Sequence, residues 1–278
     1  MRLHADCIPC YFRQALQASR MCTPDEELQW KTMRAVAQFL ASVSLDRNSI
    51  LVSEEVHEII KKTLQDPDPY LKVKEEFTEA AEEMEPRIEE IAAEGPDPLM
   101  SAVKLAIAGN IIDFGAGGEF DVESAIRGAM DFSFGVDHFA SFRKAMEGAR
   151  TVMYIGDNTG ELYFDKPLLR LLKGKDVTFV VRGGPSLNDA TVEYAERAKI
   201  HELAALADTG LTSMGFPLDR VRPEVRDLFY SADMVIAKGQ ANFESLHDRE
   251  RPGLFFLMKV KCELVAGILG AKFGDITV

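Results

Sequence analysis

Residues 151–169, TVMYIGDNTGELYFDKPLL, decide the fold that this sequence predicts. The run TVMYI has no polar alternation, which is typical of a strand buried on both faces in a parallel sheet. Asp157 and Asn158 follow it directly, and a helical pattern comes next. Asp and Asn are good N-cap residues, yet adjacent hard oxygen ligands on a tight loop also suit Mg²⁺ or Mn²⁺, which could handle a phosphate. The stretch alone leaves both interpretations open.

Two more apolar runs, DVTFVVR at 176–182 and DMVIAK at 233–238, repeat this pattern further along the chain. Helical segments at 162–174 and 190–200 separate the runs, so the order is β-α-β-α, and residues 254–270 predict one further strand and a helix. For residues 149–278 we therefore expect an α/β Rossmann-like domain, a mostly parallel sheet with helices on both faces, which carries the metal site.

Residues 1–148 have a different pattern, with apolar residues repeated at three- and four-residue spacing and no convincing strand. We expect an all-helical N-terminal region. A glycine and two prolines near 95–99 indicate a possible joint within it. The many acidic residues between Glu54 and Asp97 are best interpreted as a solvated helix face.

The composition excludes several classes of protein. A formal net charge of -13 disfavours nucleic acid as a partner, although a bound cation can still invert the field in one cleft and admit a small phosphorylated ligand. No apolar run approaches the roughly 20 residues of a membrane span, so we expect no membrane association. Four cysteines are too few for a secreted disulfide scaffold, which favours the cytoplasm. Nothing in the sequence indicates the oligomeric state.

The polar residues that follow the three predicted strands form the candidate site, because loops at the carboxyl ends of such strands converge. A metal would take charged oxygens from Asp157 and Asp189 and a neutral oxygen from Asn158. Lys238 and Arg182 would hold phosphoryl oxygens. The absence of a nucleophile elbow, a Walker lysine and a dinucleotide fingerprint leaves metal-assisted phosphoryl chemistry. The full set of candidates is Asp157, Asn158, Arg182, Asn188, Asp189, Lys238, Asn242 and Glu244.

Other polar residues could support this site. Asn110 and Asp113 are one helical turn apart and could both reach the cleft, and Glu161 lies in the first turn after the Asp-Asn pair. Cys7 and Cys10 also share one side of a helix, where they could bind a metal, form a redox pair or be ordinary buried thiols.

Four strings in this order, GNIIDF (109–114), GDNTGE (156–161), RGGPSLNDAT (182–191) and KGQANFE (238–244), resemble the motifs of the family once named domain of unknown function 89. Its members are described as metal-dependent damage-control phosphatases. CIPCYFRQAL, DPDPYLKVKEEFTEAA and FFLMKVKCELVAG also look like the branch that carries an N-terminal Cys-x-x-C. Ala241 stands where many relatives have glycine, and alanine tolerates positive φ poorly.

The resemblance implies a helical N-terminal region, a Rossmann-like domain, and a divalent metal, Mg²⁺, Mn²⁺, Co²⁺ or Ni²⁺, held by Asp157, Asn158 and Asp189. It also implies that Lys238 and Asn242 contact or position the substrate's phosphate. We therefore predict a metal-dependent phosphatase for small phosphorylated metabolites, such as sugar phosphates or damaged phosphometabolites. Either Asp157 or a water molecule would attack phosphorus. The alternatives are a phospho-ligand or nucleotide sensor without turnover and, less favoured, a carboxyl methyltransferase.

Overall fold

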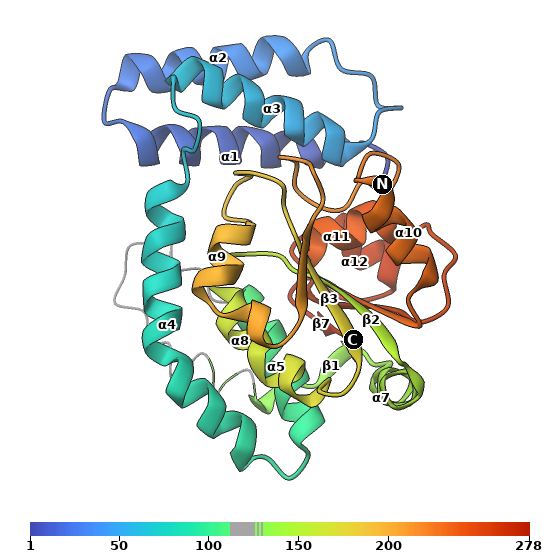
Figure 1. The fold of residues 1–278 in the computed structure, drawn as a ribbon. Coiled ribbons are helices and arrows are strands. Elements are labelled where there is room, and N and C mark those ends of the chain that lie inside the picture. Colours follow the sequence, from blue (N-terminus) through green and yellow to red (C-terminus); the bar gives the residue numbers. More distant parts are fainter. Residues whose placement is uncertain (112–125, 127, 129) are drawn as a thin grey trace.

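A seven-stranded sheet forms the centre of the molecule (Figure 1). The computed structural model describes residues 1–111, 126, 128 and 130–278. The strands are β1 (Phe134–Val136), β2 (Thr151–Ile155), β3 (Asp176–Val181), β4 (Ala205–Asp208), β5 (Met234–Lys238), β6 (Leu254–Lys259) and β7 (Ile276–Thr277).

The strand order is β1-β7-β6-β5-β2-β3-β4. The antiparallel pair is β6 with β7, and the other neighbouring pairs are parallel. From β2 the chain adds β3 and β4 on one side and later β5 and β6 on the other. The strand order therefore reverses between β2 and β5, which is where α/β sheets of this kind hold their ligands.

Both faces of β2 are buried, which explains its continuous apolar run. Val152 and Tyr154 belong to the apolar cluster on one face, and Met153 and Ile155 to the cluster on the other. Helices of the first cluster include α5 (Pro98–Ile111), α7 (Phe139–Gly148), α8 (Glu161–Leu171) and α9 (Val192–Arg197). Helices α10 (Pro223–Ser231) and α11 (Gly239–Leu246) cover the other face, and α12 (Glu263–Leu269) packs beside α11. The predicted Rossmann-like sheet with helices on both faces is confirmed.

A helical bundle precedes the sheet, as predicted. Its helices are α1 (Cys7–Cys22), α2 (Glu26–Leu40) and α3 (Ser49–Leu64), which share an apolar cluster of their own. Asp25 and Asn48 cap α2 and α3 through side-chain oxygens that accept backbone N–H groups. In Figure 1 the bundle lies across the loops at one end of the sheet. It therefore covers the edge at which the candidate site is expected.

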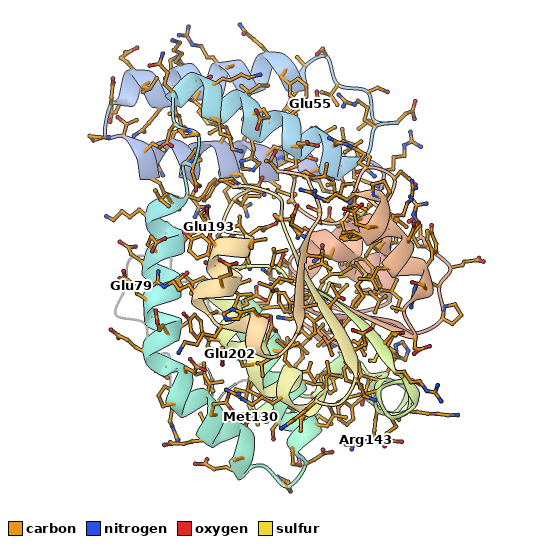
Figure 2. The ribbon with its side chains drawn as sticks, in the orientation of Figure 1. Glu55, Glu79, Met130, Arg143, Glu193 and Glu202 are labelled. Atoms are coloured by element: carbon orange, nitrogen blue, oxygen red, sulfur yellow. The ribbon has the colours of Figure 1, made fainter. Side chains whose placement is uncertain are left out.

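Helix α4 (Leu71–Glu94) leaves the bundle and runs alongside α8 and α9 (Figure 1). We expected the acidic face of α4 to be solvated, but some of its carboxylates form ion pairs with other helices. Glu85 accepts a hydrogen bond from Lys166 at 2.7 Å, and Glu75 accepts one from Arg197 at 2.8 Å. Glu79 lies on the outer side of α4 in Figure 2 and is exposed. Some of the acidic residues of α4 therefore link this helix to α8 and α9.

The segment before residue 148 is not purely helical, because β1 lies within it and pairs with β7. Helices α5 and α7 also pack in the same apolar cluster as β2 and β3. The division of the chain at 148/149 stays a prediction. Near the predicted joint, Gly95 ends α4 and Pro98 begins α5. Among the described residues, no helix combines the length and the apolarity that crossing a bilayer requires.

Candidate functional site

The loops that follow β2 and β3 are joined by backbone hydrogen bonds. Asn158 and Asp189 form an isolated antiparallel bridge. The carbonyl of Asn188 accepts the Thr159 amide at 3.0 Å, and the carbonyl of Asp157 accepts the Ala190 amide at 2.7 Å. The loop geometry therefore places Asp157, Asn158 and Asp189 together.

The carboxylate of Asp157 is held by two side-chain amides. Asn110, at the end of α5, donates through Nδ2 to Oδ2 of Asp157 at 2.8 Å and to Oε1 of Glu161 at 2.6 Å. Asn158 likewise donates through Nδ2 to Asp157 and Glu161. Because a carboxylate can only accept, these bonds leave the Oδ1 atom of Asn158 as its free ligand oxygen. Asn110 therefore contacts two carboxylates of the candidate site, and its supporting role stays a prediction.

Arg182 lies beneath the loops and ties the three segments together. Its guanidinium is 1% exposed and donates through Nε to Oδ2 of Asp189 at 2.6 Å. Its Nη2 donates to Oδ1 of Asn242 at 3.2 Å and lies 3.7 Å from Oδ1 of Asp157. Asn242 in turn donates to the carbonyls of Gly156 and Lys238, at 3.1 and 2.6 Å. Arg182 and Asn242 therefore hold the ends of β2, β3 and β5 in register.

Lys238, at the end of β5, is fully buried between two carboxylates. Its ammonium donates to Glu161 and Asp165 at 2.8 Å each, and Tyr154 also donates to Asp165, at 2.7 Å. Burial lowers the pKa of Lys238, but Asp165 and Glu161 outweigh burial and the net shift is upward. Lys238 therefore stays charged and fixes Glu161.

Negative charge exceeds positive charge at the centre of the site. Burial, followed by the charges of Glu161 and Asp189, raises the pKa of Asp157 to about 8. Burial also raises the pKa of Asp189, against the opposing effect of Arg182. Buried carboxylates that raise one another's pKa repel one another, so a bound cation would be favoured among them.

The residues present fit a hard divalent cation. Within the described residues, Oδ1 of Asp157 and Oδ1 of Asp189 accept no hydrogen bond, and Oδ1 of Asn158 is free for the reason given above. Across the same ranges, no three Asp, Glu, His or Cys side chains surround a common point. The candidate set is instead two carboxylates and an amide oxygen, with Glu161 turned toward Lys238. Oxygen ligands of this kind suit Mg²⁺ or Mn²⁺.

A cavity of about 670 Å³ opens above this floor, between the loops and helices α1 and α3. Predicted site residues that line it are Asn110, Asp157, Asn158, Asn188, Asp189 and Glu244. Four predicted site residues do not line the cavity and are buried beneath it: Glu161, Arg182, Lys238 and Asn242. The expectation that Arg182, Lys238 and Asn242 contact the phosphate directly is therefore not supported, because all three are buried and bonded to protein groups. Asp113 lies outside the described residues.

Glu244 stands apart from the candidate metal ligands, one to two turns along α11. Its Oε1 accepts a hydrogen bond from Gln240 at 2.9 Å, and Ser49 of α3 donates to its Oε2 at 3.4 Å. It therefore links the sheet loops to the bundle at the cavity wall. Cys7 and Cys10 line the same cavity, and all four cysteines are free. Burial raises the pKa of both thiols, so they are protonated at neutral pH.

Sequence reasoning missed two residues of the site. Asp165 follows Glu161 by four residues, and this spacing, on one helix face, was the available signal. Gly239 was also missed. Its φ is +75°, and an added Cβ would lie 1.9 Å from Oδ2 of Asp157. The positive φ falls at Gly239 and not at Ala241, which lies within α11, so the alanine carries no backbone strain.

Replacing Gly239 by alanine should displace the carboxylate of Asp157 and lower kcat/KM about tenfold to a hundredfold, since small misplacements of reacting groups are costly. Steady-state kinetics would measure this. Gly174→Ala is the matched control, because Gly174 also has positive φ, +93°, but has nothing within 4 Å of its added Cβ. Equal effects of the two changes would show that only backbone strain matters.

Comparison with known proteins identifies the family of this chain. The model of the damage-control phosphatase ARMT1-like domain matches residues 3–277. A damage-control phosphatase from Pyrococcus horikoshii is 32% identical over 273 residues, which cover 96% of this chain and 93% of the relative. One from Archaeoglobus fulgidus is 31% identical over 293 residues, covering 99% and 98%.

A solved structure gives the same result. The crystal structure of a DUF89 family protein from Pyrococcus horikoshii superposes with a TM-score of 0.90 at 31% identity, covering 99% of this chain and 98% of the other. The residues matched by the family model, 3–277, include every strand of the sheet and every loop of the candidate site. This chain therefore belongs to the damage-control phosphatase ARMT1-like (DUF89) family.

Proposed function

We propose that this protein is a metal-dependent phosphatase that hydrolyses small phosphorylated metabolites, such as sugar phosphates or damaged phosphometabolites. The observation that carries the proposal is the floor of the cavity, where Asp157 and Asp189 lie buried with unbonded oxygen atoms at the reversal of strand order. Relatives at 31–32% identity that are named damage-control phosphatases support it.

Asp157, Asn158 and Asp189 would hold the metal, and Mg²⁺, Mn²⁺, Co²⁺ and Ni²⁺ are the candidates. A divalent cation there would supply charge neutralisation and polarisation of the phosphoryl group. Asn110 orients Asp157, and Arg182 orients Asp189, so both carboxylates are fixed before a ligand arrives. Preorganisation of this kind limits the reorganisation that the reaction must undergo.

The other residues of the site would not contact the phosphoryl group of the substrate. Lys238 donates hydrogen bonds to Glu161 and Asp165, and Glu161 also accepts the side-chain amides of Asn110 and Asn158. The cavity wall, with Asn188 and Glu244, would contact the rest of the substrate. We thus assign Lys238 a positioning part in place of the phosphate contact that the sequence suggested.

The attacking oxygen belongs either to Asp157 or to water, and the two routes differ in what remains on the protein. Attack by Asp157 forms an aspartyl-phosphate and releases the alcohol, after which water cleaves the acyl phosphate. Direct attack by water leaves Asp157 unmodified. Mass spectrometry of acid-quenched protein during turnover distinguishes the routes.

The test of this function is phosphate release from metal-stripped protein. Mg²⁺, Mn²⁺, Co²⁺ and Ni²⁺ are each added back, with an aryl phosphate and a panel of sugar phosphates as substrates. We expect phosphate to be released only when metal is present. Metal and ligand binding without release would favour a sensor, and transfer of a methyl group to a carboxylate would favour a methyltransferase. Either result contradicts the proposed function.

A further inference from the structure

The loop between β3 and α9 carries Asp189 and closes on itself at its base. The amide of Arg182 donates to the carbonyl of Ala190 at 2.9 Å, so the two ends of the loop lie side by side. Further out, the carbonyl of Pro185 accepts a hydrogen bond from Nζ of Lys61, a residue of α3, at 2.9 Å. The base of the loop therefore belongs to the sheet, whereas its outer part is held by the bundle.

A turn in this outer part has a backbone conformation that its sequence does not favour. The Asp189 amide donates to the carbonyl of Ser186 at 2.9 Å, so Leu187 is the first central residue of a four-residue turn. Its φ is +43°, a region that turns usually fill with glycine or asparagine. The other non-glycine residues with positive φ in the described ranges, Gln65 and Lys199, lie at helix ends. A leucine in this conformation needs a compensating contact elsewhere.

The side chain of Leu187 makes that contact inside the helical bundle. It packs against the apolar cluster of α1, α2 and α3. Among the residues that the structure describes, every other member of this cluster lies between Leu3 and Tyr70. Burial of the leucine side chain offsets the strain of its backbone. The bundle therefore stabilises the conformation of the turn that ends at Asp189.

This turn leads directly to the candidate metal ligands. The carbonyl of Asn188 accepts the Thr159 amide at 3.0 Å, and Asp189 forms its backbone bridge with Asn158. Leu187, Asn188 and Asp189 also line the cavity. A change in the turn would therefore move Asp189 relative to Asn158.

We propose that Leu187 is a positioning residue through which the helical bundle fixes the carboxylate of Asp189 beside Asp157. This inference rests on the proposed function and deepens it, because the bundle then helps to assemble the metal site that it covers. Leu187 acts through the backbone of the loop and not as a ligand. Its removal should therefore loosen the loop and weaken metal binding while every proposed ligand remains in the chain.

Amide hydrogen exchange of metal-free protein tests whether Leu187 holds the loop. In Leu187→Ala the amides of Asp189 and Ala190 should lose protection, because the turn loses its contact with the bundle. Leu187→Met keeps an apolar side chain of similar volume and should restore the protection. Leu64→Ala is the matched control, since Leu64 is a partly buried leucine of the same cluster that does not line the cavity. Unchanged protection in Leu187→Ala, or an equal loss in Leu64→Ala, would overturn the inference.

Calorimetric titration with Mn²⁺ measures the consequence for the metal site without turnover. Leu187→Ala should raise the dissociation constant of Mn²⁺ about tenfold, as when a group that orients a metal ligand is removed. Leu187→Gly relieves the backbone but also lacks the side chain, so it should bind Mn²⁺ as weakly. Lys199→Gly relieves a positive φ at an exposed position outside the cavity and should match the unmodified protein. Unchanged affinity in Leu187→Ala, or full affinity in Leu187→Gly, would show that the side chain does not position Asp189.

The two measurements distinguish failure of this inference from failure of the proposed function. Weaker Mn²⁺ binding in Leu187→Ala, without phosphate release by any of the proteins, would support the positioning role and contradict the phosphatase. Metal-dependent phosphate release, with an unchanged loop and unchanged Mn²⁺ affinity in Leu187→Ala, would support the phosphatase and contradict the positioning role. Failure of the unmodified protein to bind Mn²⁺ or any other divalent metal would contradict both.

Discussion

Asp157→Asn is expected to lower kcat/KM for phosphate release on the order of a thousandfold, comparable with the loss of a key electrostatic group in other active sites. The change keeps the size of the side chain but removes one of the two charged groups that we propose as metal ligands. The hydrogen bonds that reach Asp157 come from Asn110 and Asn158, and the Asn oxygen can still accept them. Steady-state kinetics across a range of metal concentrations would measure the loss.

The same change should have the opposite effect on metal-free stability. Burial and the charges of Glu161 and Asp189 already oppose ionisation of Asp157. A neutral side chain removes that repulsion, so metal-stripped Asp157→Asn should unfold at the same or a higher temperature and should lose the stabilisation by added metal. Asp176→Asn, at an exposed position at the start of β3, is the matched control. Unchanged activity, or unchanged metal stabilisation, would contradict the proposed role of Asp157 as a metal ligand.

The second large effect concerns the buried lysine. Lys238→Met should lower the free energy of unfolding by about 3–5 kcal/mol, because it leaves two buried carboxylates without their cation. Both partners, Glu161 and Asp165, are fully buried. Urea unfolding followed by circular dichroism would measure the change.

Two comparisons make this prediction specific. Lys166→Met removes a lysine that pairs with Glu85, whose side chain is 28% exposed, so water can solvate the partner and the cost should be smaller. Adding Asp165→Asn to Lys238→Met should recover part of the lost stability, since one uncompensated charge disappears. If Lys238→Met cost no more than Lys166→Met, the lysine would not be the cation that the site depends on.

The sequence predicted the elements whose patterns are local. The runs in β2, β3 and β5 lack polar alternation because both of their faces are buried, and this reveals a parallel sheet without knowledge of the tertiary structure. The short strands β1 and β7 carry no such pattern. They contain three and two residues and form only because β6 supplies an edge.

In the candidate site, too, some residues have a local sequence signal and others do not. Asp157, Asn158 and Asp189 could be proposed because each follows a strand at the same sheet edge. The burial of Lys238 could not, because its partner Asp165 lies 73 residues away in the sequence and the pairing depends on how α8 packs against β5.

The most direct test of the metal centre is a crystal structure with Mn²⁺ and inorganic phosphate, with anomalous diffraction data to locate the metal. We expect an anomalous peak bonded to oxygen atoms of Asp157, Asn158 and Asp189, with phosphate beside the metal, and we expect the peak to be lost in Asp157→Asn. A peak at another place, or none at this site in protein that releases phosphate under the same conditions, would contradict the account.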